Sequence, residues 1–188
     1  MGVYLLKECE GRFVSSESEL IAFKEGVKGV ECVHCHRVGT LNSHGYLTDQ
    51  SGEVRGLRLW CCPRRGSRPG CGKTFSIFLA DVLPGYSVPA LMLASFLLAW
   101  SQLRGDVLAA WEQATTGFST DSAYRWIRRF KLNQGEVRAQ LCRARSPPPP
   151  RGDGILADLF EHLNLVTESN GFTHAFQLRF QRPWPMGL

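Results

Sequence analysis

Two pairs of cysteines limit most strongly how this chain can fold. Cys32 and Cys35 form a C-x2-C pair, and Cys62 and Cys71 form a second pair across a longer loop. The segment around them, residues 32–78, is rich in glycine and arginine and has only short alternating stretches, so its apolar core is small. Four thiolates on two tight turns can hold a tetrahedral zinc ion, whose binding energy contributes directly to folding. The sequence therefore predicts a zinc ribbon with the ligands Cys32, Cys35, Cys62 and Cys71.

The third zinc ligand is open between two adjacent cysteines, Cys61 and Cys62. We favour Cys62, because it begins the turn that closes on Cys71. Cys61 would instead share one face of a strand with Leu57 and Leu59, since alternate residues of a strand point to the same side.

Other cysteines and histidines allow alternative interpretations. Three histidines near the pairs could replace a cysteine as ligand, although a place on a solvent-facing turn explains them more simply. A thiol oxidoreductase also uses a C-x-x-C pair, but places it at a helix start in a βαβ unit, and no such unit surrounds Cys32. Cys9 and Cys142 are expected to be ordinary thiols. The histidines in question are His34, His36 and His44.

Basic residues are concentrated in two segments of the 188-residue chain, whose formal net charge is +5. Residues 55–73 contain six basic and no acidic residues, and residues 125–145 contain seven basic residues and one acidic residue. The first segment includes the loop residues Arg64, Arg65 and Arg68. Such a distribution is consistent with an acidic partner such as nucleic acid. We expect this arginine loop to grip the DNA backbone independently of sequence, and a merely solvated loop is the alternative.

The apolar segments argue against a membrane protein. The longest apolar run, residues 88–100, is shorter than the roughly 20 residues that cross a bilayer. No secretory leader is visible near Met1, so we expect a cytoplasmic, bacterial and nucleoid-associated protein. The hydrophobic fraction of 44% is that of a globular protein.

Several segments have the apolar periodicity and capping residues of helices. Ser87, Asp106 and Ser119 can each cap one. The helix that begins at Ser119 either continues past Phe130 or breaks near residues 133–135. The expected helices are residues 15–27, 87–102 and 107–115, one from 119, and a further one at 136–143 if a break occurs.

The helix expected at residues 107–115 and the helix that begins at Ser119 are predicted to form a helix-turn-helix. Gly117 permits the positive φ of the turn, Phe118 fills the angle between the helices, and Ser119 starts the next helix. Apolar residues at helical spacing from Ala123 to Phe130 would face the core. The outward face then consists of Thr120, Asp121, Tyr124, Arg125, Arg128 and Arg129.

This outward face has the chemistry of a recognition helix. We expect Arg125 to read bases, and Arg128 and Arg129 to grip phosphates, with Thr120 and Tyr124 nearby. The alternative is a structural helical hairpin whose arginines are only solvated.

A proline-rich boundary separates the C-terminal segment from the rest. Residues 147–150 are four consecutive prolines, which form a stiff extended spacer. Beyond them, residues 153–163 have helical periodicity, and residues 172–180 alternate like a strand. We expect residues 151–188 to be an assembly element for a second copy or another protein, with folding back on its own chain as the alternative.

At this point the sequence resembles the zinc-ribbon and helix-turn-helix head of bacterial insertion-sequence transposases, over residues 30–132. The resemblance rests on the cysteine pair 32–35, the stretches 58–62 and 70–76, and the segment from Gly117 to Trp126. In that family the head binds the terminal inverted repeats of the element, which implies a comparable role for Arg125, Arg128 and Arg129.

The sequence departs from this family in three respects. The second cysteine pair spans a longer arginine-rich loop, and Gln113 replaces a usually small alanine. The family's catalytic domain, with three metal-binding carboxylates, has no room in residues 151–188. The sequence as a whole predicts an α+β fold. Its expected divisions are an N-terminal helix at 1–30, a zinc ribbon at 31–80, a helix-turn-helix bundle at 86–145, a spacer at 146–150 and the assembly element at 151–188.

The resulting functional prediction is a non-enzymatic, sequence-specific binder of double-stranded DNA. We expect an accessory of a mobile genetic element that acts with a separate transposase or recombinase. A transcriptional regulator and a protein-interaction adaptor of a nucleoprotein complex are the alternatives.

Overall fold

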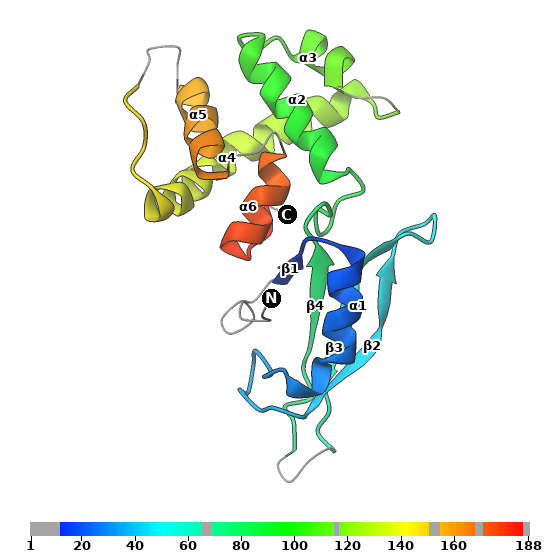
Figure 1. Cartoon of the computed structure of the whole chain (residues 1–188). Coiled ribbons are helices and arrows are strands. Elements are labelled where there is room, and N and C mark those ends of the chain that lie inside the picture. Colours follow the sequence, from blue (N-terminus) through cyan, green and yellow to red (C-terminus); the bar gives the residue numbers. More distant parts are fainter. Residues whose placement is uncertain (1–11, 65–68, 115–116, 151–154, 168–170, 186–188) are drawn as a thin grey trace. The chain divides into compact units, whose positions relative to one another are not determined.

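Short strands and amphipathic helices follow one another along the chain in a mixed α+β architecture, as predicted (Figure 1). The computed structural model describes residues 12–64, 69–114, 117–150, 155–167 and 171–185. The chain divides into two compact units, Met1–Val82 and Leu83–Leu188. The described residues include no helix with the length and apolar character needed to cross a membrane.

The first unit is built on a four-stranded sheet with the strand order β1-β4-β3-β2. Strand β3 (Val54–Cys61) pairs antiparallel with β2 (Leu41–Thr48) and β4 (Thr74–Leu79). Strand β1 (Arg12–Val14) lies parallel to β4 on the other edge. We did not predict β1, because three residues are too few to show an alternating pattern.

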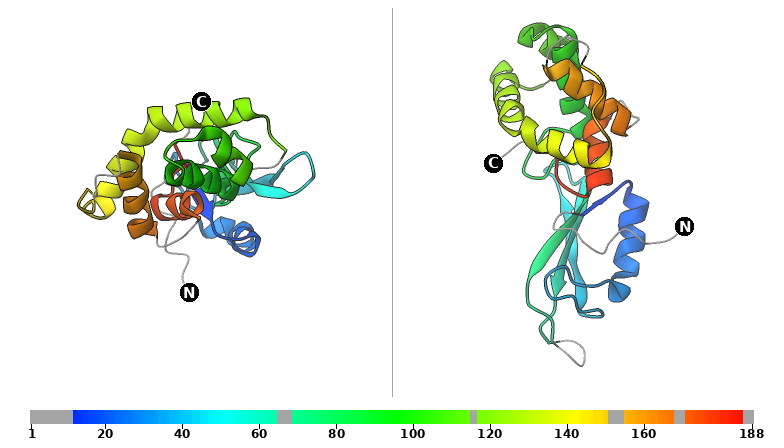
Figure 2. Two further views of the ribbon diagram at one scale, coloured as in Figure 1. Left: turned by 90° about the horizontal axis from the view of Figure 1, so that it is seen from above. Right: turned by 90° about the vertical axis from the view of Figure 1, so that its left-hand side faces the viewer.

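Helix α1 (Glu17–Glu25) covers one face of this sheet (Figure 2), and a 3-10 turn, η1 (Val27–Gly29), follows it. The helix begins at Ser16, whose hydroxyl accepts a hydrogen bond from the Glu19 N–H at 3.3 Å. Its buried side chains, Leu20 and Phe23, belong to the same core as the inward-facing residues of β3 and β4. The helix predicted at residues 15–27 is thus confirmed.

The second unit contains the helices α2 (Ala90–Gln102), α3 (Val107–Ala114), α4 (Thr120–Ala144), α5 (Ile155–Thr167) and α6 (Phe172–Phe180). Asp106 caps α3 as predicted, since its carboxylate accepts from the Ala109 N–H at 3.1 Å. Ser87 does not cap α2, which begins after Pro89. Val88, between Ser87 and the helix, is buried in the core, and the helix begins two residues later at Ala90.

Helix α4 is continuous over 25 residues and passes through Gly135, so the unbroken alternative is confirmed. Two polar side chains near this glycine bond back to the helix, with Asn133 donating to the Arg129 carbonyl and Gln134 to the Lys131 carbonyl. Beyond Gly135 the apolar stripe resumes with the buried residues Val137 and Leu141. The helix therefore has a core to pack on along its whole length.

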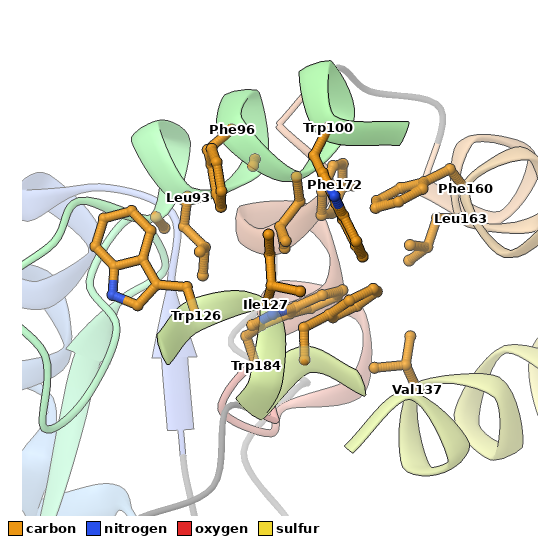
Figure 3. Close-up of a cluster of buried hydrophobic side chains, with 14 of the residues drawn as sticks. Leu93, Phe96, Trp100, Trp126, Ile127, Val137, Phe160, Leu163, Phe172 and Trp184 are labelled. Carbon is orange, nitrogen blue, oxygen red and sulfur yellow. The ribbon is translucent and has the colours of Figure 1, made fainter. Parts of the chain in front are cut away.

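Aromatic side chains fill the core of the second unit (Figure 3). Trp126 of α4 packs against Phe96 of α2, with ring centroids 5.8 Å apart, and against Trp111 of α3 at 5.1 Å. Phe130, one turn further along α4, stacks on Phe160 of α5 at 5.8 Å. Residues from all parts of this unit thus share one core.

The strand predicted at residues 172–180 is wrong, because this segment forms helix α6. Phe172 and Phe176 are buried one helical turn apart, and Thr173 donates a hydrogen bond to the Ala90 carbonyl at 2.8 Å. The phenylalanines at 172, 176 and 180 satisfy a spacing of two and a spacing of four equally. Packing against α2 and α5 selects the helix.

The C-terminal segment folds back on its own chain, which was our alternative to assembly. Its buried residues lie in the same core cluster as α2 and α4, so they are not available to a partner. His162 is also buried, and its Nε2 lies 2.9 Å from the Arg145 carbonyl at the end of α4. The members of the shared core from this segment are Leu159, Phe160, Leu163, Val166, Phe172, Phe176 and Trp184.

Candidate metal centre

Four cysteines of the first unit meet in one cluster. The Sγ atoms of Cys32, Cys35, Cys61 and Cys71 all lie within 4.8 Å of one another. Cys32 and Cys71 are 3.8 Å apart, and Cys35 and Cys61 are 3.7 Å apart. A tetrahedron of thiolates with metal–sulfur bonds of about 2.3 Å has edges of about 3.8 Å, whereas a disulfide would need about 2 Å. The four thiols therefore match the geometry of a site that could coordinate a metal ion.

The structure places Cys61 in this cluster, and not Cys62 as predicted. Cys61 does share a strand face with Leu57 and Leu59, as the alternation predicted, and all three are fully buried. This face is the one that α1 covers, and the turn bearing Cys32 lies at its end. The inward position therefore directs Cys61 into the cluster, while Cys62 is buried outside it.

A tight turn places the first cysteine pair. The His36 N–H donates to the Cys32 carbonyl at 2.8 Å, and the Cys32 N–H donates to the Arg37 carbonyl at 3.0 Å. His36 adopts a positive φ of 57° here. In addition, the His34 N–H points at the Cys32 sulfur at 3.4 Å, so the backbone supplies positive charge density to a thiolate.

A second turn, at the end of β3, places the other pair. The Gly72 N–H donates to the Cys61 carbonyl at 2.9 Å, and the Cys71 N–H donates to the Cys61 sulfur at 3.2 Å. Gly72 has a φ of 76°, which glycine adopts without steric cost. The long loop between Cys62 and Cys71 thus still ends in a compact ligand turn.

The protonation of these thiols is uneven. Burial raises the pKa of Cys32 to about 12 and also raises the pKa of Cys71. Burial acts in the same direction on Cys61, but the Thr40 hydroxyl at 3.2 Å and the Cys71 N–H outweigh it and lower that pKa to about 7. If all four thiols bound as thiolates, their negative charges would lie close together, and a cation would have to balance them.

We expect Gly70→Ala to weaken metal binding at this cluster. A Cβ at Gly70 would lie 2.6 Å from the Cys61 sulfur and 2.5 Å from the Cys62 carbonyl oxygen, so the turn or the sulfur must shift. The control is Gly29→Ala, because nothing lies within 4 Å of the Cβ position there. Competition with a coloured chelator measures both affinities. We expect a loss of about tenfold or more for Gly70→Ala, as for a disturbed supporting shell, and an equal affinity of the two variants would contradict this role.

The three alternative histidine ligands stay outside the cluster. The His34 ring meets the edge of Phe75 at 6.1 Å, and His36 Nδ1 lies 2.7 Å from the Glu31 carboxylate. His44 is exposed on β2. Cys142 is exposed on α4, and Cys9 lies outside the described residues.

The second predicted site is the outer face of α4. Thr120, Tyr124, Arg125 and Arg128 are exposed there, while the opposite face is buried. Arg129 is half-buried, donates a hydrogen bond to the Tyr86 hydroxyl at 2.6 Å and lies over that ring at 5.2 Å.

Sequence reasoning missed the pairing of Arg129 with Tyr86. The two residues are 43 positions apart, and no local pattern relates them. Of the predicted arginine loop, Arg64 is exposed, and Arg65 and Arg68 lie outside the described residues.

No family model, no curated protein and no solved structure matches this chain.

Proposed function

We propose that this chain is a zinc-stabilised protein that binds a specific sequence of double-stranded DNA through a helix-turn-helix formed by α3 and α4. The observation that carries the proposal is the division of α4 into two faces. Tyr124, Arg125 and Arg128 are exposed on one face, and Trp126 and Ile127 are buried on the other. A helix that lies in the major groove needs this division between polar readers and packing residues.

The turn before α4 supports the same arrangement. Gly117 has a φ of 88°, and the Phe118 ring packs on Trp126 with centroids 5.8 Å apart. This contact fixes the angle at which α4 leaves the turn. The helix begins at Thr120, and Ser119 at its N-cap makes no side-chain capping bond, so the N-terminal end of the helix dipole favours phosphate.

The arginines receive different roles in this proposal. Among the residues that the structure describes, Arg125 bonds to the Ser122 hydroxyl, at 3.2 Å, and it lies near the start of the helix, so we assign it to base reading. Arg128, one turn further along, is assigned to phosphate. Arg129 positions the helix through its contacts with Tyr86, and we do not assign it a contact with DNA.

We expect Arg125→Ala to weaken binding to the preferred duplex by about 5- to 150-fold, as for the loss of one bidentate arginine–guanine contact. Arg128→Ala is expected to weaken binding to preferred and scrambled duplexes alike. The control is Arg143→Ala, an exposed arginine about 27 Å further along the same helix. Fluorescence anisotropy after selection of a preferred site from random duplexes measures all three. Equal losses on both duplexes for Arg125→Ala would contradict base reading.

The metal in this proposal is zinc, since four cysteines form a closed structural site that suits it. The proposed partners are the DNA ends of a mobile element and its separate transposase or recombinase, an assignment that rests on the resemblance over residues 30–132. A palindromic selected site would indicate a dimer. A chain that binds no duplex but retains a protein partner would favour the adaptor alternative.

A further inference from the structure

The sheet of the first unit has a second face that the proposed function does not use. Helix α1 lies on one face, and no helix among the described residues of this unit lies on the other (Figure 2). Register defines the uncovered side, because paired residues of neighbouring strands share a face. Trp60 pairs with Thr74 and Arg58 pairs with Ser76, and all four point away from α1. We call these four residues the Trp60 face.

The chemistry of the Trp60 face is aromatic and cationic. Arg58 and Thr74 are exposed, and Trp60 and Ser76 are half-buried. Strands β2, β3 and β4 contain no aspartate or glutamate. The surface thus attracts anions and has no carboxylate on its strands to repel them.

Trp60 is held in place by a bond of its own. Its indole N–H donates to the Gly72 carbonyl at 3.1 Å, which satisfies the single polar group of the side chain. What remains for a ligand is the ring itself. A ligand that gains from this face must therefore combine a flat apolar group with negative charge, and a nucleotide with an unpaired base has both.

We propose that the Trp60 face binds single-stranded nucleic acid, with one base stacked on Trp60 and the adjoining phosphate held by Arg58. Arg58 is two residues from Trp60 along β3, a separation of about 7 Å, so its long side chain reaches the backbone of a strand stacked beside it. The hydroxyls of Thr74 and Ser76, on the adjacent strand, add phosphate donors. A duplex does not satisfy this surface, because its bases are stacked on one another and present no open ring face.

The test measures binding of the zinc-loaded full chain to a fluorescein-labelled oligothymidylate and to a duplex of equal length. Trp60→Leu keeps an apolar side chain and removes the ring, and we expect it to lose about 5- to 150-fold in single-strand affinity, as for one base–aromatic stack. Trp60→Phe is expected to retain most of the affinity. Arg58→Gln is expected to flatten the slope of log affinity against log salt by about 0.7.

Two controls separate this site from α4 and from a folding defect. Tyr46→Ala removes a half-buried aromatic residue from the α1 side of the same sheet and is expected to leave single-strand binding unchanged. Arg125→Ala is expected to weaken duplex binding alone, so the two proposals fail separately. Each variant must retain the metal content of the parent chain.

Three outcomes would overturn the proposal. The parent chain binds no oligothymidylate, or Trp60→Leu and Arg58→Gln both leave its affinity unchanged, or Trp60→Leu lowers duplex and single-strand affinity equally.

Discussion

In a Cys61→Ala variant we expect the bound metal to be lost and the first unit to unfold, whereas Cys62→Ala keeps both. The Cys61 sulfur lies 3.7 Å from that of Cys35 and accepts the Cys71 N–H, so its removal opens the tetrahedron. Cys62 is buried outside the cluster, and its backbone N–H donates a hydrogen bond to the Thr40 carbonyl at 2.8 Å. Structural zinc in small sites contributes about 10–16 kcal/mol of apparent binding energy, which is more than a small unit can lose.

Elemental analysis of zinc per chain, with circular dichroism of the same samples, compares the two variants. The two residues are adjacent and buried, so each serves as the size-matched control for the other. A strong chelator added to the parent chain should reproduce the Cys61→Ala spectrum. Full zinc content in Cys61→Ala, or its loss in Cys62→Ala, would restore the original assignment to Cys62.

A second large effect is expected from Phe172→Ala, which should lower the free energy of unfolding of the second unit by about 3–5 kcal/mol. Phe172 is 1% exposed, and its ring lies 5.3 Å from Phe160 and 5.4 Å from Trp184, measured between centroids. Truncation to alanine leaves a cavity between α5, α6 and the non-helical segment that carries Trp184. Since domains are stable by about 5–15 kcal/mol, this loss is a large part of the total.

Urea unfolding followed by near-ultraviolet circular dichroism measures this change. The control is Arg182→Ala, at an exposed residue whose 3.9 Å ion pair with Glu136 is worth little. A chain that ends at Pro150 should not form the second unit at all. If that shorter chain is soluble and folds cooperatively, residues 151–188 are not part of the core, and the Phe172 prediction fails with them.

The sequence predicted most of the helices in which the spacing of apolar residues fits only one kind of secondary structure. Helices α1, α3 and α4 were recognised because apolar residues recur at helical spacing behind a capping residue. Helix α6 was not, because phenylalanines four residues apart also fit an alternating strand. Strand β1 was too short to carry any pattern. For α6 and for β1, contacts with residues far away in the sequence determine the structure, and a local sequence pattern does not report such contacts.

The cysteine cluster was predicted in three of its four residues. Two turns of cysteines indicate a tetrahedral site from spacing alone. Cys61 is the last residue of β3 and Cys62 follows it, and the side chains of consecutive extended residues point to opposite sides. Choosing between them requires knowing which face meets the turn of Cys32, a relation between residues far apart in sequence. The phase of Cys61 with Leu57 and Leu59 was the available signal, and we interpreted it as core packing only.

Gly135, in the middle of α4, has a mechanical consequence. Nothing lies within 4 Å of the position its Cβ would occupy, so no packing requires a glycine there. Glycine in a helix interior is less favourable than alanine by about 1 kcal/mol, and it lowers resistance to bending. On one side of it Trp126 and Ile127 anchor the helix, and on the other Val137 and Leu141 do. Gly135, the residue at which α4 bends most easily, therefore lies between two anchored segments of a helix about 37 Å long. A bend of α4 is therefore expected at Gly135, between these two anchored segments.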